Sequence, residues 1–227
     1  MKKRVKTAAL AIAIFAGIGG TAQAEGFKTG VDLVSSFVWR GSDIGDSPAI
    51  QPNLSYTLPG SGIVLGAWGT YAVTDYQPSG ENYKEVDLFV TVPAGPFSFT
   101  LTDYHNATDT TPDKARTFDF SKDGPNVVEV SAGYSKGNLS LLAAINVAGT
   151  DNRNAKYFEA GYKFYEKDGY SARVIAGAGN ENYYGDAEGD NIALVNTGVS
   201  VSKDRFTGSL VYNPDTQKSN LVFSASF

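Results

Sequence analysis

Residues 50–58 read Ile-Gln-Pro-Asn-Leu-Ser-Tyr-Thr-Leu, so an apolar side chain stands at every second position. Successive side chains of an extended chain point to opposite faces, and this period of two predicts a β-strand with one apolar and one polar face. Residues 85–92, 97–102 and 139–147 repeat the pattern. Strands with two unlike faces are therefore the recurring unit of this chain.

Twelve segments of roughly ten residues carry this alternation and are predicted as strands. Their ranges are 27–40, 48–59, 62–73, 83–94, 96–104, 126–136, 138–148, 155–166, 169–179, 191–202, 205–213 and 218–227.

The connections between these segments alternate between tight turns and longer polar stretches. The tight turns are 59–61, 94–95, 135–138, 166–169 and 202–204, and the longer links are 41–47, 74–82, 105–125, 149–154, 180–190 and 214–217. Short turns at one rim and long loops at the other are typical of bacterial outer-membrane barrels. We therefore predict an all-β fold: a membrane-spanning, antiparallel, up-and-down barrel of about twelve strands, with short periplasmic turns and longer extracellular loops.

The first residues carry the pattern of an export signal. A small and apolar run, Thr7–Gly20, follows four basic residues and ends in Thr21-Ala22-Gln23-Ala24, an A-x-A cleavage site; the basic residues are Lys2, Lys3, Arg4 and Lys6. A retained anchor helix is the alternative, but the run is shorter than the ~20 residues that a hydrocarbon layer requires. We predict a cleavable signal peptide at 1–24 and a single transmembrane barrel domain at 25–227.

Composition excludes several classes of function. Removing the signal moves the formal net charge from −5 to −9, and such an acidic chain lacks the basic surface that nucleic acid requires as a partner. The chain contains no cysteine, so disulfides are excluded. No later apolar run reaches helix-spanning length, and any crossing of a membrane must therefore use strands in a closed barrel.

Alternation alone does not reveal whether the apolar face meets lipid or fills a water-soluble core. Aromatic side chains favour lipid outside, because rings gather at the two interfaces of membrane barrels. At the turn rim we place Phe97, Tyr134, Phe164, Tyr170, Phe206 and Phe227, and at the loop rim Trp39, Tyr71, Tyr83, Tyr104, Phe158 and Tyr212.

The last strand adds a separate signal. Leu221, Phe223, Ala225 and the final Phe227 fall on one face. This ending resembles the carboxy-terminal signature by which outer-membrane barrels are handed to their assembly machinery. Outer-membrane lipid and that machinery are thus the expected partners, the machinery through the strand that ends at Phe227.

Two stretches resemble the TorF-type porin family. The first is Ser35-Ser36-Phe37-Val38-Trp39-Arg40-Gly41 followed by Pro48-Ala49-Ile50-Gln51-Pro52, and the second is Gly62-Ile63-Val64-Leu65-Gly66-Ala67-Trp68-Gly69. Beyond about residue 70 the similarity is one of strand rhythm. The resemblance implies a bacterial outer-membrane barrel and a porin-like role, with no substrate or catalytic residue attached.

The inward face is where polar and ionisable side chains would line a lumen. The predicted lining residues are Asp32, Arg40, Glu85, Asp87, Glu129, Glu159, Lys163 and Arg173. Both signs of charge occur, so facing acids and bases could orient passing solutes. Equally, they could pair across a narrow interior and plug it. Side chains fill the interior of an eight-stranded barrel, and a sixteen-stranded barrel leaves an open channel. The interior of a twelve-stranded barrel is intermediate in width.

Loop residues suggest three further alternatives. The stretch 107–125 is either a solvated cap or a constriction folded inward, and the acidic run 181–190 is a solvated loop or, less favoured, a divalent-cation site. His105 is the only histidine of the chain. A barrel hydrolase would need this histidine paired with a serine and oriented by a third polar group. The candidate partners, Ser98, Asn106 and Ser121, are near His105 only in sequence. A surface histidine at a strand end is the favoured interpretation.

These observations predict a porin for passive diffusion of small hydrophilic solutes. The alternatives are a closed structural or surface-binding outer-membrane barrel, an outer-membrane hydrolase using His105, and a soluble periplasmic barrel that holds a ligand. We expect no catalytic activity. Because phosphate-binding glycine loops and metal-ligand clusters are missing from the sequence, no cofactor and no metal are expected either.

Overall fold

The computed structural model describes residues 25–74, 82–106, 118–121, 126–149, 154–185 and 189–227. Nearly all described residues are in strands. These are β1 Gly26–Val34, β2 Val38–Trp39, β3 Ser42–Asp43, β4 Ala49–Thr57, β5 Val64–Ala72, β6 Lys84–Ala94, β7 Phe97–Asn106, β8 Asn126–Lys136, β9 Leu139–Gly149, β10 Lys156–Lys167, β11 Tyr170–Asn180, β12 Ile192–Lys203, β13 Phe206–Asn213 and β14 Lys218–Ser226, with one short helix, α1 Glu181–Tyr184.

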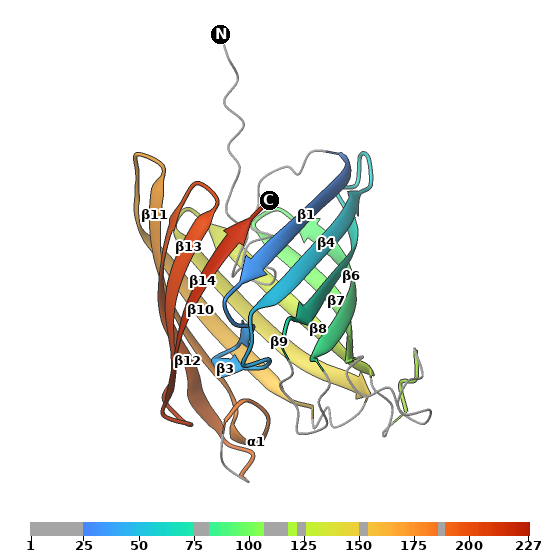
Figure 1. Ribbon diagram of the computed structural model, residues 1–227. Coiled ribbons are helices and arrows are strands. Elements are labelled where there is room, and N and C mark those ends of the chain that lie inside the picture. Colours follow the sequence, from blue (N-terminus) through green and yellow to red (C-terminus); the bar gives the residue numbers. More distant parts are fainter. Residues whose placement is uncertain (1–24, 75–81, 107–117, 122–125, 150–153, 186–188) are drawn as a thin grey trace.

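Twelve of these strands form one closed antiparallel barrel (Figure 1). Each strand pairs with its neighbour along the chain, and β1 closes the barrel by pairing with both β4 and β14. Closure leaves no sheet edge unpaired. The prediction of an all-β barrel of about twelve strands is confirmed, and the short turns all lie at one rim, together with the carboxyl terminus (Figure 1).

The first predicted strand, 27–40, is wrong in its second half. β1 ends at Val34, and residues 38–43 form a separate hairpin in which Val38 pairs with Asp43 and Trp39 with Ser42. The alternation continues past Val34 because the hairpin is also extended, so the sequence pattern does not mark the point where the chain leaves the barrel wall. We call residues 38–43 the inner hairpin.

The apolar face of the wall points outward. Large apolar side chains stand exposed along every wall strand, among them Leu33, Ile50, Leu54, Leu65, Leu88, Leu101, Leu141, Val174, Leu210 and Leu221. Most of the opposite, inward positions are polar and buried, among them Gln51, Asp87, Thr91, Thr102, Asn146, Asn196 and Ser209, and a minority are apolar, such as Trp68 and Val222. A water-soluble barrel would show the reverse, because apolar side chains then fill the interior.

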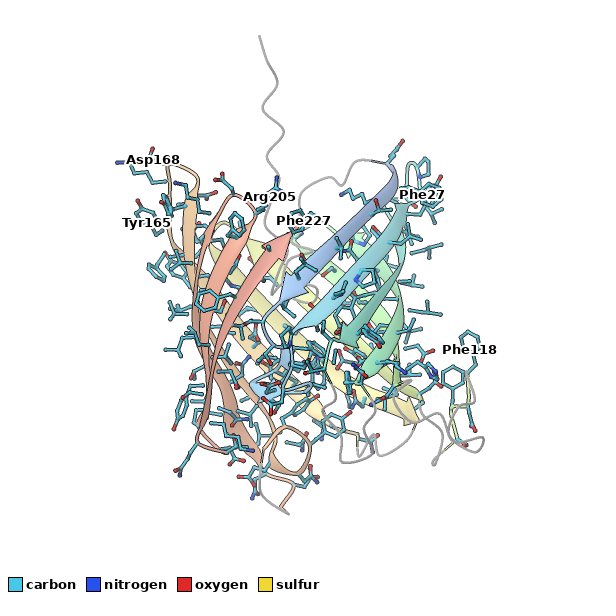
Figure 2. The ribbon with its side chains drawn as sticks, in the orientation of Figure 1. Phe27, Phe118, Tyr165, Asp168, Arg205 and Phe227 are labelled. Carbon is cyan, nitrogen blue, oxygen red and sulfur yellow. The ribbon has the colours of Figure 1, made fainter. Side chains whose placement is uncertain are left out.

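Aromatic side chains surround the turn rim as predicted. Phe97, Phe164, Tyr170, Phe206 and Phe227 are exposed there, and Tyr134 packs on Phe97. Figure 2 shows Phe27, Tyr165 and Phe227 at this same end.

At the loop rim the aromatic prediction is only partly correct. Tyr71, Phe158 and Tyr212 are exposed, but Trp39, Tyr83 and Tyr104 lie inside the barrel. Tyr83 and Tyr104 point inward because they are an even number of positions from the inward-facing residues of β6 and β7. Trp39 lies inside because it belongs to the inner hairpin.

The predicted long loops are mostly outside the described residues. Of the stretch 107–125, only 118–121 are described, so the choice between cap and constriction stays open. The start of the acidic run 181–190 is α1 instead of a loop. No helix in the described part of the chain is long and apolar enough to cross a membrane. The predicted signal peptide, 1–24, also lies outside the described residues.

Candidate functional site

The inner hairpin crosses the barrel interior near the loop rim. It is joined to the wall at β1 and β4, yet Arg40 contacts Glu129 on β8, four strands from β4 around the barrel. Gly41 lies against the backbone of Val195 on β12, in the other direction around the wall. A short segment thus touches widely separated strands, which is possible only across the interior.

The tip of the hairpin is a two-residue turn in which both central residues have positive φ, 49° at Arg40 and 90° at Gly41. This is the primed turn geometry that matches the twist of a β-hairpin. At Gly41 a side chain is also excluded by space, because a Cβ would lie 2.0 Å from the carbonyl oxygen of Val195. Glycine therefore lets the tip approach β12 closely.

Arg40 forms a two-pronged ion pair at the centre of the site. Its two terminal nitrogens donate to the two carboxylate oxygens of Glu129 at 2.7 and 2.8 Å, and one of them also donates to the Tyr184 hydroxyl at 2.8 Å. The side chains of Arg40 and Glu129 are 5% and 1% exposed. In so dry a setting, removing either partner leaves a costly unpaired charge.

Three aromatic rings surround the Arg40 guanidinium. Its carbon lies 4.5 Å from the ring centre of Trp39, 4.4 Å from that of Tyr157 and 5.6 Å from that of Tyr184. A flat guanidinium can stack on rings and donate in its own plane at once, which a lysine ammonium cannot do. The site is therefore fitted to arginine in particular.

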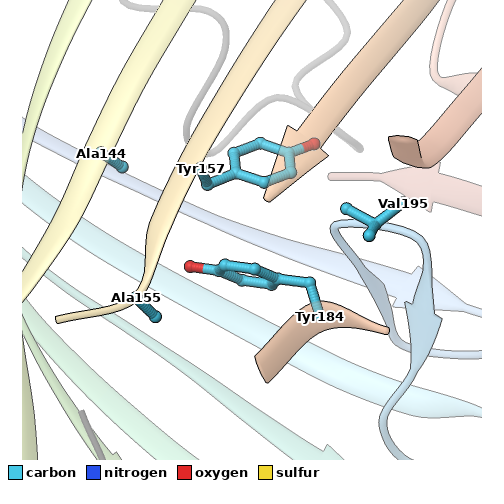
Figure 3. Close-up of a cluster of buried hydrophobic side chains, with 5 residues drawn as sticks. All are labelled: Ala144, Ala155, Tyr157, Tyr184 and Val195. Carbon is cyan, nitrogen blue, oxygen red and sulfur yellow. The ribbon is translucent and has the colours of Figure 1, made fainter. Parts of the chain in front are cut away.

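Two of these rings belong to a small apolar cluster of Ala144, Ala155, Tyr157, Tyr184 and Val195 (Figure 3), and Trp39 packs against it. Tyr184 enters it from α1, and its ring centre lies 5.3 Å from that of Tyr157. Burial raises the pKa of Tyr184 to about 12. The phenol is uncharged at neutral pH, so it can accept the Arg40 hydrogen bond without adding a buried charge.

An acidic region lies beside this cluster, on β6 and β7. Asp87 is 1% exposed and lies in the interior near Glu85, Asp103 and Glu129. Glu85 lies two residues away on the same face and accepts a hydrogen bond from the Tyr83 hydroxyl. Burial raises the pKa of Tyr83 well above its ordinary value.

His105 lies at the end of β7, close to Asn126. Its Nδ1 is 3.2 Å from the Asn126 amide oxygen, whose amide nitrogen donates to Asp103. Ser98 is on the same strand seven residues away, roughly 23 Å at the rise of an extended strand. The histidine that an esterase would need is therefore not in contact with that serine.

A cavity of about 210 Å³ occupies the interior between the inner hairpin and the turn rim. Val38–Gly41 form its inner end, and residues of β9 to β13 form its walls. Ser202 and Thr207, which face each other across β12 and β13 one step from a tight turn, belong to its outer end. The half of the barrel nearest the turns is thus partly open.

The eight predicted lining residues fall into two groups. Asp32, Asp87 and Glu129 are buried in the interior, and Glu85 lies beside Asp87 on the same face. Glu159, Lys163 and Arg173 line the cavity, together with Arg40, which also belongs to the ion pair. Lys163 pairs with Glu166, and Arg173 donates to Ser140 at 2.7 Å and lies 3.8 Å from Glu159. That these residues line a conducting path stays a prediction.

Sequence reasoning missed the hairpin contacts and the roles of Tyr157 and Tyr184. Tyr157 has inward parity on its strand, which alternation could have revealed. Tyr184 lies within the predicted link 180–190, and no periodicity indicates that its side chain packs inside the barrel.

Comparisons with known proteins give one family match. A model of the family described as "Bacterial protein of unknown function (Gcw_chp)" matches residues 19–212. One solved chain, from "Unveiling the Mechanism Behind the in-meso Crystallization of Membrane Proteins", aligns over 90% of this chain and 83% of that chain, with 9% identity and a TM-score of 0.49. No curated protein matches. The resemblance to the TorF-type porins is not confirmed.

Proposed function

The chain belongs to the Gcw_chp family of bacterial proteins of unknown function, and from that premise we propose that it is an outer-membrane barrel admitting small hydrophilic solutes when its inner hairpin moves. The closed twelve-strand fold fits an outer-membrane location. The export signal at 1–24, lipid as the outer partner and delivery by the assembly machinery through the strand ending at Phe227 are parts of this proposal.

The outward apolar face supports insertion into lipid. Contiguous exposed apolar surface of this extent is rare on a soluble monomer and marks a membrane or an interaction surface. Here it continues around the whole wall and meets aromatic residues at the turn rim. A closed barrel also satisfies the backbone groups that lipid would leave unpaired.

The Arg40–Glu129 ion pair carries the proposal that the hairpin is a gate. It connects the hairpin tip to the far wall, and the hairpin has no sheet pairing with that wall. A buried ion pair gives little net stability compared with apolar packing of the same volume, because both charges lose their hydration. Such a polar contact suits a plug that has to leave its closed position for the lumen to open. The cavity between the hairpin and the turn rim leaves room for a solute.

Swelling of lipid vesicles in isotonic sugar solution tests the proposal. Vesicles that contain refolded residues 25–227 should swell slowly, and an Arg40→Met variant should swell faster because the hairpin loses its anchor. Equal, background swelling by both proteins in vesicles with proven insertion would overturn the gate and favour the closed structural or surface-binding barrel.

We propose no catalytic role for this chain. His105 hydrogen-bonds to Asn126, and Ser98 lies far along the same strand. Ester and phospholipid hydrolysis by the refolded protein should stay at background, and activity abolished by His105→Ala would contradict this.

A further inference from the structure

The cavity between the inner hairpin and the turn rim has features of a binding site. Its volume of about 210 Å³ is below the ~300–1,000 Å³ of pockets for drug-sized ligands, so an occupant would be small. Its lining combines charged, amide and hydroxyl groups with two aromatic residues and several aliphatic ones. A purely structural void would be lined by apolar groups alone, without these polar groups.

Two buried polar atoms on the cavity wall lack partners. The Oδ1 atom of Asn196 and the Oγ atom of Ser209 make no hydrogen bond within the described residues, although these residues are only 4% and 3% exposed. Asn196 donates through Nδ2 to the Tyr157 hydroxyl at 2.9 Å and to Glu159, which fixes the amide with its oxygen on the other side. Because both atoms are on residues that line the cavity, an occupant could supply the hydrogen bonds that they lack.

The charges on the wall favour a neutral occupant. Arg173 lies 3.8 Å from Glu159, and Lys163 pairs with Glu166. Arg40 is already neutralised by Glu129. Glu159 would repel a small anion, and Lys163 and Arg173 would repel a small cation. Neither an anionic nor a cationic ligand therefore finds an unpaired opposite charge on this wall.

Hydroxyl groups are the chemistry that this wall matches best. A hydroxyl both donates and accepts, so one ligand group can face an arginine, a carboxylate or the free oxygen of Asn196. The wall itself presents a hydroxyl-rich surface: Ser171, Ser200, Ser202, Thr207 and Ser209. At the inner end, the half-buried Trp39 offers ring surface to the C–H face of a sugar.

We propose that this cavity binds a neutral, polyhydroxylated solute of monosaccharide size. A role for this binding in uptake rests on the proposed function, but the binding itself does not. The site adjoins the ion-paired tip of the hairpin, which forms its inner end, and its other contacts come from β9 to β13 on the turn side.

Equilibrium titration of refolded residues 25–227 in detergent micelles tests the site, with D-glucose, D-galactose and D-ribose as probes and succinate as an anionic comparison. The signal is the fluorescence of Trp39, which lines the cavity; Trp68 is the second of the chain's two tryptophans. At least one sugar should give a saturable change that added salt leaves unaltered, since screening weakens only charged contacts.

Two serine variants provide a matched comparison. Ser209→Ala should weaken sugar binding about fivefold, the worth of one hydrogen bond, without harming the fold because its Oγ has no partner. Ser224→Ala is the control: Ser224 is 6% exposed with an unpartnered Oγ on the inward face of β14, outside the cavity lining, and its loss should leave binding unchanged.

Three results would overturn the site: no saturable response to any of the sugars, salt-sensitive binding of succinate alone, or equal weakening by both serine variants. Vesicle swelling keeps the two proposals separate. Sugar binding without swelling contradicts only the porin function, and swelling without sugar binding contradicts only the cavity site.

Discussion

At the scale of single residues, Arg40 makes the contacts that hold the inner hairpin against the far wall of the barrel. It carries a full charge at a position that water barely reaches, and it is tolerated there because Glu129 and Tyr184 accept its hydrogen bonds while three rings cover its faces. Burial and the neighbouring Glu129 act on its pKa in opposite directions, and the outcome is a pKa well above the ordinary value. Arg40 is therefore charged at neutral pH.

Replacing Arg40 by methionine should destabilise the protein by about 3–5 kcal/mol, because Glu129 is left charged and unpaired in the interior. The double variant Arg40→Met, Glu129→Met should regain most of that loss, since two apolar side chains of similar volume need no partner. Urea unfolding in lipid vesicles measures both. A double variant no more stable than the single one would show that the ion pair is not the contact that matters.

At the scale of elements, the hairpin shows where sequence reasoning stopped. The wall strands could be predicted because each must present one apolar and one polar face, and this period is written in their residues. The hairpin is also extended, so residues 35–40 continue the same alternation. Tertiary contacts separate the hairpin from β1, because the hairpin tip contacts Glu129 and Val195, which are more than 80 positions away in the sequence.

Gly41→Ala should displace the inner hairpin, because its Cβ would meet the carbonyl oxygen of Val195 in addition to the strain of a positive φ. Gly60→Ala is the matched control, since Gly60 also has a positive φ but has open space around it. The control should cost about 1–2 kcal/mol of backbone strain and leave the hairpin in place.

The fluorescence of Trp39 distinguishes these two variants, because its ring packs on the buried cluster only while the hairpin is docked. We expect a shift of the emission maximum to longer wavelength in Gly41→Ala and none in Gly60→Ala. Identical spectra would mean that β12 accommodates a methyl group and that the tip is not closely fitted.

At the scale of the whole molecule, the main result is the direction of the two faces. The eight lining residues were predicted because they occupy the polar positions of the alternating pattern. The same alternation placed the apolar side chains of β4, β6, β7 and β9 on one common face. It did not show which side of the wall that face covers, because a soluble barrel has the same period. The exposed apolar wall of the folded chain decides the point.

Exposed apolar positions of the wall should tolerate a charge according to their depth in the membrane. Leu101→Arg, in the middle of β7, should weaken folding into lipid vesicles by about 2–4 kcal/mol, whereas Phe97→Arg at the turn rim should cost about 0–1 kcal/mol. Both side chains are about half exposed, at 50% and 47%. Folding yield against urea in vesicles measures the difference, and two equal, small effects would indicate a wall that faces water.

Single-channel recording in a planar bilayer tests the central claim, that the inner hairpin closes the lumen of a membrane-inserted barrel. The protein, residues 25–227, is compared with a variant in which 36–47 are replaced by a short glycine and serine linker. We predict long closed periods with rare openings for the parent and a steady, larger conductance for the variant. A variant that inserts but conducts no better than its parent would contradict the account.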